Sequence, residues 1–206
     1  MQDLIWKNKE SKLIAACRMF SVYRNLAQAP GRDSIYDFYV LKLFNWANVI
    51  PITSDQQVVF VKQYRHGIGH VTLEIPGGVV DGEDKDPLKT AQRELFEETG
   101  YKAKEMIFLG EYHPNPAMQD NICCAYLAEN VIKISEPTFD AEGFEVIEVC
   151  LIPLTQVPQM IANGDITHSA VITAFHLLGL YNSKIGVERA ALVQGRDLPS
   201  KGTNYV

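Results

Sequence analysis

The stretch EIPGGVVDGEDKDPLKTAQRELFEETGY, Glu74 to Tyr101, decides how this chain is interpreted. It combines a glycine pair, a predicted helix and a cluster of carboxylates. Asp86 can accept the unpaired N–H groups of a first helical turn, and the proline that follows is preorganised for the first helical position. Gly100 is suited to the left-handed conformation that ends a helix. The stretch therefore predicts a helix between Asp86 and Gly100, shortly after a tight turn.

The predicted helix has an apolar side and an acidic side. Leu88, Ala91 and Leu95 follow the i, i+3, i+7 spacing of a face that packs on a core. Glu94, Glu97 and Glu98 stand at i, i+3 and i+4, so their side chains share one patch. Like charges there destabilise the helix, and its C-terminal dipole adds to the repulsion. A solvated acidic face is one interpretation. A divalent cation site removes the conflict, since Mg²⁺ prefers oxygen ligands and keeps water molecules for chemistry.

The spacing of these residues resembles a known family. The nine residues RELFEETGY, Arg93 to Tyr101, match every fixed position in the core of the Nudix box, G-x5-E-x7-R-E-U-x-E-E-x-G-U with U apolar. Upstream, QYRHGIGHVTLEIPGG resembles the lead-in of the ADP-ribose and nucleoside-diphosphate-sugar pyrophosphatase branch. The resemblance extends over about residues 11–182. It implies metal-dependent hydrolysis of the pyrophosphate linkage of ADP-ribose or a related nucleotide sugar, with two or three Mg²⁺ ions, or Mn²⁺ in their place.

The box departs from the family pattern at its start. Counting back from Arg93, the family's glycine and first glutamate should lie at positions 79 and 85, which are Val79 and Lys85. The spacing indicates one residue inserted between Gly78 and Asp86. We expect Glu83 to keep some supporting function for the displaced glutamate.

The resemblance assigns roles to the residues at the end of the helix. Glu94 and Glu98 are the leading metal ligands, and Glu97 is a third ligand or the base that holds the attacking water. Gly77 offers its carbonyl to the metal. Arg93 orients a glutamate through a bidentate pair.

Two further loops are expected to contribute. Relatives often draw a general base or an extra metal ligand from a late loop, and here FDAEGFEVIEV offers Glu145 first and Glu142 second; a plain solvated loop is the alternative. The loop HPNPAMQDN, His113 to Asn121, lies where the family reads its substrate, and Pro116 has the distance from Gly100 that the ADP-ribose subgroup shows. The acidic residue that often follows is absent unless Asp120 serves.

Candidate substrate contacts lie earlier in the chain. Arg65 is predicted to pair either with a substrate phosphate or with Glu74, and Glu74 is predicted to hold the ribose or base or to pair with Arg65. Tyr36, Phe38 and Trp46 are candidates to stack on a base, although aromatic residues of strands more often belong to a core. His66 and His70 are four apart, but the glycines between and beside them predict a loop rather than a zinc helix.

Composition narrows the class of protein. The chain has 206 residues, 47% of them hydrophobic, and a net charge of −6, which argues against nucleic acid or an anionic membrane as a partner. No run approaches the roughly 18 apolar residues of a spanning helix, and the start MQDLIWKNKE lacks signal-peptide order, so we expect a cytoplasmic protein. The four cysteines form no CxxC pair and are predicted to be buried free thiols.

The order of predicted elements indicates an α+β fold. Strand-like segments alternate with single helices, which predicts a Nudix-type α/β/α sandwich with a mixed sheet, preceded by a small antiparallel β element. We expect that β element at residues 1–46, where the resemblance implies a homodimer contact, a hydrolase domain at 47–182 and a tail at 183–206. Two other functions remain open: hydrolysis of nucleoside triphosphates or dinucleoside polyphosphates, and a catalytically weak nucleotide-sugar sensor.

Overall fold

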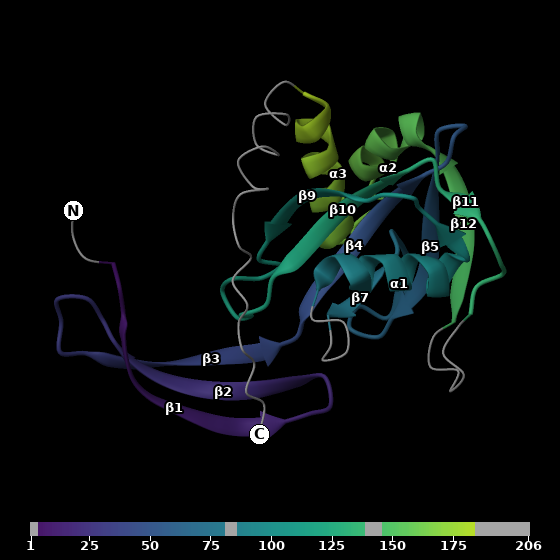
Figure 1. Cartoon of the computed structure of the whole chain (residues 1–206). Helices are drawn as coiled ribbons and strands as arrows, with labels where there is room; N and C mark the ends of the chain where they lie inside the picture. Colours follow the sequence, from purple (N-terminus) through teal and green to yellow (C-terminus); the bar gives the residue numbers. More distant parts are fainter. Residues whose placement is uncertain (1–3, 81–85, 139–145, 184–206) are drawn as a thin grey trace.

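The computed structural model describes residues 4–80, 86–138 and 146–183 (Figure 1). A separate three-stranded sheet precedes a body with helices on both faces of a central sheet. The strands are β1 (Lys7–Ala16), β2 (Phe20–Gln28), β3 (Ile35–Leu43), β4 (Asn45–Ile52), β5 (Gln57–Arg65), β6 (His70–Glu74), β7 (Gly77–Val80), β8 (Tyr101–Lys102), β9 (Ile107–Tyr112), β10 (Cys123–Glu129), β11 (Ile132–Lys133) and β12 (Ile147–Pro153). The helices are α1 (Pro87–Thr99), α2 (Val157–Asn163) and α3 (Ser169–Asn182), with a 3₁₀ turn at Leu154–Gln156.

The central sheet is mixed, as predicted. Its order is β12-β5-β4-β10-β9, with β6 paired to β5 and β7 paired to β4. β4 and β10 run parallel, and the other described pairs of this sheet are antiparallel. β7 therefore places its two glycines beside β4, in the middle of the sheet.

Helices cover the two faces of this sheet with separate cores. On one face, Ala91 and Leu95 of α1 pack with Val49, Val59 and other buried residues. On the other face, α2 and α3 pack against Ile50, Phe60 and Leu127, and the Phe60 ring stacks on the Phe175 ring at 5.8 Å between centroids. The alternation of β4 residues between the two cores follows from the period of two in a strand.

Helix α1 begins and ends where the sequence predicts. The Asp86 carboxylate accepts a hydrogen bond from the Leu88 N–H at 3.0 Å, and Pro87 is the first helical residue. Gly100 takes a left-handed conformation with φ of 74°, and its N–H bonds to the Phe96 carbonyl. The last turn carries no basic residue, so nothing within that turn compensates the glutamates or the dipole.

The N-terminal sheet β1-β2-β3 stands away from the body (Figure 1). All ten residues of β1 are exposed, and large apolar side chains such as Ile14, Ile35 and Tyr39 remain about half exposed. Phe44 alone separates β3 from β4. The sheet ends at Leu43, close to the boundary at residue 46 that the sequence suggests.

One cysteine corrects the sequence prediction. Cys123 and Cys124 are buried and Cys150 is half-buried, but Cys17, in the turn between β1 and β2, is exposed. Burial raises the pKa of the Cys123 thiol to about 11 and that of Cys124 to about 12. The described helices include none that is both long and apolar enough to cross a bilayer.

Candidate active site

The β7–α1 corner brings two glutamates of the helix onto the glycine pair. The Gly77 N–H donates to Glu98 Oε2 at 3.1 Å, and Glu98 is 5% exposed. The Glu94 carboxylate lies directly over Gly78, because a Cβ built on Gly78 would be 2.0 Å from Glu94 Oε1. The absence of a side chain at Gly78 therefore makes room for the Glu94 carboxylate, whereas Gly77 meets Glu98 through its N–H.

Arg93 contacts Glu94 and a third glutamate of the helix, Glu97. Its Nη1 atom lies 3.0 Å from Glu94 Oε1 and 2.9 Å from Glu97 Oε2. One guanidinium nitrogen therefore bridges two glutamates, while the bidentate pair expected from the sequence stays a prediction. Glu94 is mostly buried, whereas the Glu97 side chain is 43% exposed, so Arg93 joins a buried carboxylate to one at the solvent edge.

The donor set at this corner suits a hard divalent cation. Glu94, Glu97 and Glu98 lie on one helix at i, i+3 and i+4 and supply carboxylate oxygens, the ligands that a hard divalent cation prefers. Glu98 is buried and the Glu94 side chain is only 13% exposed, and a charge so far from water needs a strong partner. Across residues 4–80, 86–138 and 146–183, no three acidic, histidine or cysteine side chains are gathered into a ready-made ligand cluster.

Arg65 and Glu74 form the ion pair that the sequence allowed. Arg65 donates to the two Glu74 oxygens through Nε and Nη2, each at 2.7 Å, and the Thr72 hydroxyl also bonds to Glu74. Burial alone would raise the pKa of Glu74, which is 4% exposed, but the Arg65 hydrogen bonds and charge hold this pKa below its usual value. The pair fixes the strand that leads into the glycine turn.

Sequence reasoning gave no role to His168. His168 is the N-cap of α3: its Nδ1 accepts from the Ala170 N–H at 3.2 Å, and its Nε2 lies 3.6 Å from Glu74 Oε2. Burial lowers the pKa of His168, and the Glu74 charge only partly opposes this. Its position just before the apolar period of α3 was the available signal.

The predicted substrate loop is attached to the N-terminal sheet. The Leu41 N–H donates to the Met118 carbonyl at 2.7 Å, the Asp120 N–H to the Leu41 carbonyl at 3.3 Å, and the Leu43 N–H to Asp120 Oδ1 at 3.2 Å. Asp120 is thereby a backbone anchor. Pro116 is exposed in the same loop.

The aromatic candidates lie in different places. Tyr36 and Phe38 are 48% and 43% exposed on the N-terminal sheet, where both meet the Trp6 ring edge to face. They are not core residues. Trp46 lies on β4 opposite Val79, one residue from Gly78, and is therefore much nearer the glutamates.

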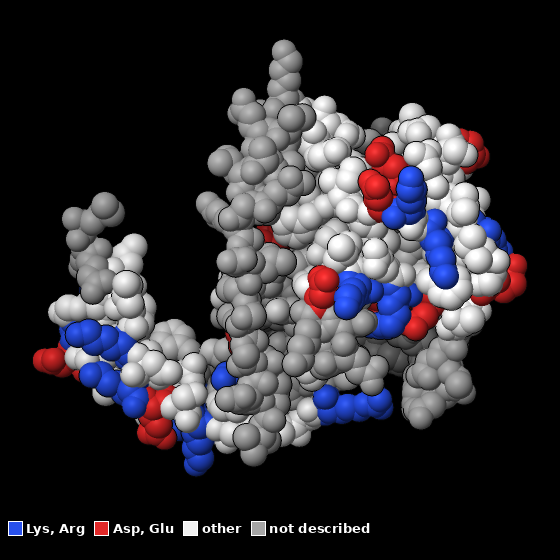
Figure 2. Space-filling model, viewed as in Figure 1, with Lys and Arg blue, Asp and Glu red and all other residues white. Residues whose placement is uncertain are grey.

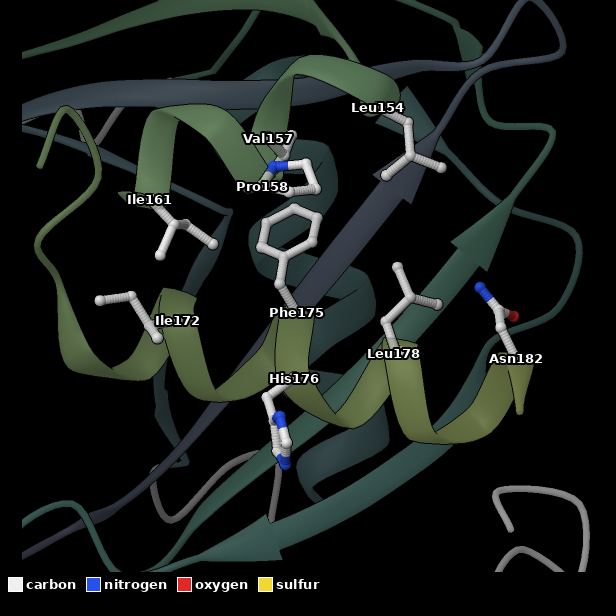
Figure 3. A pocket seen from close by; sticks show the side chains of 10 residues that line it. Leu154, Val157, Pro158, Ile161, Ile172, Phe175, His176, Leu178 and Asn182 are labelled. Carbon is white, nitrogen blue, oxygen red and sulfur yellow. The ribbon is translucent and has the colours of Figure 1, made fainter. Parts of the chain in front are cut away.

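Two other surface features differ in character from this corner. A groove of about 470 Å³ between α2 and α3 is lined mainly by apolar side chains such as Val157, Ile161 and Phe175 (Figure 3). On the face drawn in Figure 2, Lys and Arg side chains are mixed with Asp and Glu rather than gathered in one basic stripe. Glu83, Glu142 and Glu145, for which the sequence predicts roles, lie outside the described residues.

Comparison with known proteins decides the family. The model of the NUDIX domain matches residues 44–175. The chain belongs to the Nudix family. This confirms the family and enzyme class that the box predicts, and the match begins one residue after β3 ends.

Relatives of this Nudix chain carry several names. It is 28% identical over 180 residues to the ADP-ribose pyrophosphatase of Bacillus subtilis, covering 84% of the chain and 95% of the relative. It is 28% identical over 178 residues to the CMP-5'-(N-acetyl-N-hydroxy-3-aminopropyl)phosphonate hydrolase of Streptomyces rubellomurinus, covering 85% and 83%. The crystal structure of an ADP compounds hydrolase matches with a TM-score of 0.71 at 17% identity, over 93% of this chain and 97% of that one. The last match confirms the predicted fold.

Proposed function

We propose that this Nudix protein hydrolyses the pyrophosphate linkage of ADP-ribose or a related nucleoside diphosphate sugar, giving a nucleoside monophosphate and a sugar phosphate. The observation that carries the proposal is the convergence of Glu94 and Glu98 on the glycine pair of β7. A site with buried carboxylates and close backbone approach suits metal-bridged phosphate oxygens. The similarity to ADP-ribose pyrophosphatases over most of both chains supports the choice of substrate.

The roles of the residues follow from their positions. Glu94, Glu98 and the Gly77 carbonyl would hold Mg²⁺ or Mn²⁺, and Glu97 at the solvent edge would hold a further ion or the attacking water. When bound, the metal supplies charge for the pyrophosphate and lowers the pKa of a bound water. Arg93, bonded to both Glu94 and Glu97, would hold the two carboxylates in a fixed orientation. Glu142 and Glu145 are kept as candidates for the general base.

Substrate contacts are proposed from residues around this corner. Arg65, fixed by Glu74, would face a phosphate, since a guanidinium can bond a carboxylate and a phosphate at once. Trp46 would stack near the glycine turn, and Tyr36 would contribute from the N-terminal sheet. Pro116 would shape the loop that meets the far end of the substrate.

The CMP-phosphonate hydrolase among the relatives favours a second candidate reaction on a different nucleotide. Both reactions cleave a nucleotide at phosphorus, so the experiment must decide which substrate is preferred and not which bond-breaking chemistry is used. ADP-ribose, other nucleotide sugars, a CMP-linked phosphonate and nucleoside triphosphates would be assayed with Mg²⁺ and Mn²⁺. We expect the highest kcat/KM for ADP-ribose, and a triphosphate turned over in preference would overturn the proposal.

Glu98→Gln tests the metal role in the same assay. It keeps the size of the buried side chain and an oxygen for the Gly77 N–H, but removes the charge that binds the cation. We expect activity to fall by about 10²-fold or more, as for loss of a ligand or of its positioning. The exposed Glu148→Gln on β12 is the matched control. Equal activity of both variants would contradict the assignment.

We further propose that the protein is a cytoplasmic homodimer in which the N-terminal sheet forms the contact. The sheet exposes apolar residues on an open edge, a state that strands in monomers usually avoid. Light scattering at micromolar concentration should give twice the chain mass of 23.1 kDa. A monomer at that concentration would refute the dimer.

A further inference from the structure

The first turn of α3 is tied to the neighbourhood of the glycine turn by two chains of polar contacts. Both chains start at Ala170, a residue that is 7% exposed. One leaves from its N–H and reaches Glu74 through His168, and the other leaves from its carbonyl and reaches Asn48 through Tyr112.

The first chain depends on the protonation of His168. Because Nδ1 accepts from the Ala170 N–H, the neutral ring carries its proton on Nε2, the atom that faces Glu74. At 3.6 Å the contact with Glu74 is electrostatic and too long for a hydrogen bond. Glu74 is held in turn by Arg65 and Thr72, three residues before Gly77.

The second chain crosses the sheet. Tyr112 on β9 donates its hydroxyl proton to the Ala170 carbonyl at 3.2 Å and accepts from Asn48 Nδ2 at 3.3 Å. Burial raises the pKa of Tyr112, so its hydroxyl stays protonated. Asn48 Oδ1 is buried without a hydrogen-bond partner in the described part of the chain, so the bond from Nδ2 to the Tyr112 hydroxyl is what holds this amide.

Asn48 is in direct contact with the glycine turn. It is the register partner of Gly77 in the β4–β7 pair, and a Cβ on Gly77 would lie 2.8 Å from the Asn48 Cα and Cβ atoms. Such close approach leaves no room for either backbone to move alone. A shift of Asn48 therefore moves Gly77, whose N–H holds the Glu98 carboxylate.

We propose that His168 and Tyr112 are positioning residues. Through their contacts with the first turn of α3, they hold the backbone of the glycine turn, Gly77 and Gly78, in place. The two chains meet at Ala170 and end on opposite sides of the glycine turn, at Glu74 before it and at Asn48 across from it. The effect on catalysis rests on the proposed function, but the effect on the turn itself does not.

The test uses the exchange of the Gly77 amide proton, measured on the full chain by NMR or by mass spectrometry of peptides that cover residues 75–80. We expect His168→Ala and Tyr112→Phe each to speed this exchange about five- to tenfold, because the loss of one cap or hydrogen bond favours local opening by about that factor. kcat for the preferred substrate should fall about tenfold, while KM changes less than about twofold. His176→Asn, an exposed position on the same helix, is the control and should change neither.

His168→Asn separates positioning from simple capping. Asparagine keeps a cap acceptor for the Ala170 N–H, but its shorter side chain does not reach Glu74. We expect the melting temperature to recover, with Gly77 exchange still fast and kcat still low. Recovery of all three would show that His168 is a cap and overturn its part of the proposal. Unchanged exchange in Tyr112→Phe would overturn the second chain. If the wild type hydrolyses none of the substrates tested, the proposed function fails, and the exchange result still decides this inference.

Discussion

Replacing Gly78 by alanine should disable the site while leaving the fold intact. Glycine is not needed here for its backbone conformation, since Gly78 does not lie at positive φ. A Cβ at this position would lie 2.0 Å from Glu94 Oε1 and 2.4 Å from its Cδ, so the carboxylate must retreat by about 1 Å to reach the 3.0 Å below which real contacts essentially never fall. The atoms in the way are the end of a flexible side chain. The cost in stability is therefore that of one strained rotamer, about 0.5–1.5 kcal/mol.

Gly77→Ala supplies the contrast. Its Cβ would lie 2.5 Å from the Ala47 carbonyl oxygen and 2.8 Å from the Asn48 Cα, atoms that belong to the central strand. Backbone in the middle of a sheet cannot turn aside, and overpacking of this kind costs about 1–3 kcal/mol. For a chain of this size that corresponds to a fall in melting temperature of roughly 2–12 °C.

The assay compares melting temperature with kcat/KM for both variants, with Gly67→Ala as control because its Cβ would meet nothing within 4 Å. We expect Gly78→Ala to lose about 10–100-fold in kcat/KM, as when a ligand is displaced by about 1 Å, with a fall in melting temperature of about 1–6 °C. In Gly77→Ala the fall in melting temperature should be the main effect. Full activity in Gly78→Ala would refute the placement of Glu94 as a working ligand. An unchanged melting temperature in Gly77→Ala would refute the close approach of β7 to β4.

Three further outcomes are expected. Arg93→Ala should lower kcat/KM about 10–100-fold with a small thermal shift, since the side chain is one-third exposed, whereas exposed Lys89→Ala should not; identical kinetics would argue against an orienting role. Folding lowers the pKa values of both His168 and Glu74, so each group stabilises the folded state above its unfolded pKa, 6.5 and 4.5, and this contribution is lost as pH falls. Melting curves from pH 7.5 to 4 should show the loss of stability. Between pH 6.5 and 5 the loss should be smaller in His168→Asn. At pH 8 a maleimide should label Cys17 first, and a fast phase that survives Cys17→Ser would contradict its assignment as the exposed thiol.

The sequence was informative where local chemistry decides the structure. The start of α1 at Asp86 and its end at Gly100 depend on capping within a few residues, so both were predictable. The spacing of Glu94, Glu97 and Glu98 fixed their common face for the same reason. The glycine pair could be named from the sequence, but its pairing with β4 required the fold.

What the sequence could not give depends on contacts between distant segments. Whether Arg65 pairs with Glu74 or faces outward is decided by the β5–β6 register and by Thr72. His168 meets Glu74 across 94 positions of sequence, and Tyr112 meets Asn48 across 64. Tyr36 and Phe38 looked like core residues because aromatic strand residues usually are, yet they lie on a sheet that projects from the body. No local pattern encodes such pairings.

The main-chain bonds between β3 and the loop at residues 113–122 have an evolutionary consequence. Leu41 bonds through its N–H to the Met118 carbonyl and through its carbonyl to the Asp120 N–H, and the Leu43 N–H bonds to the Asp120 carboxylate, so the projecting sheet and this loop are held together as one piece. Any change in the position of the N-terminal sheet, whether caused by a changed partner or by a changed surface, therefore also moves the loop. Under the proposed function and the proposed dimer, relatives that remodel their assembly would be expected to shift substrate preference without a single substitution near the glutamates.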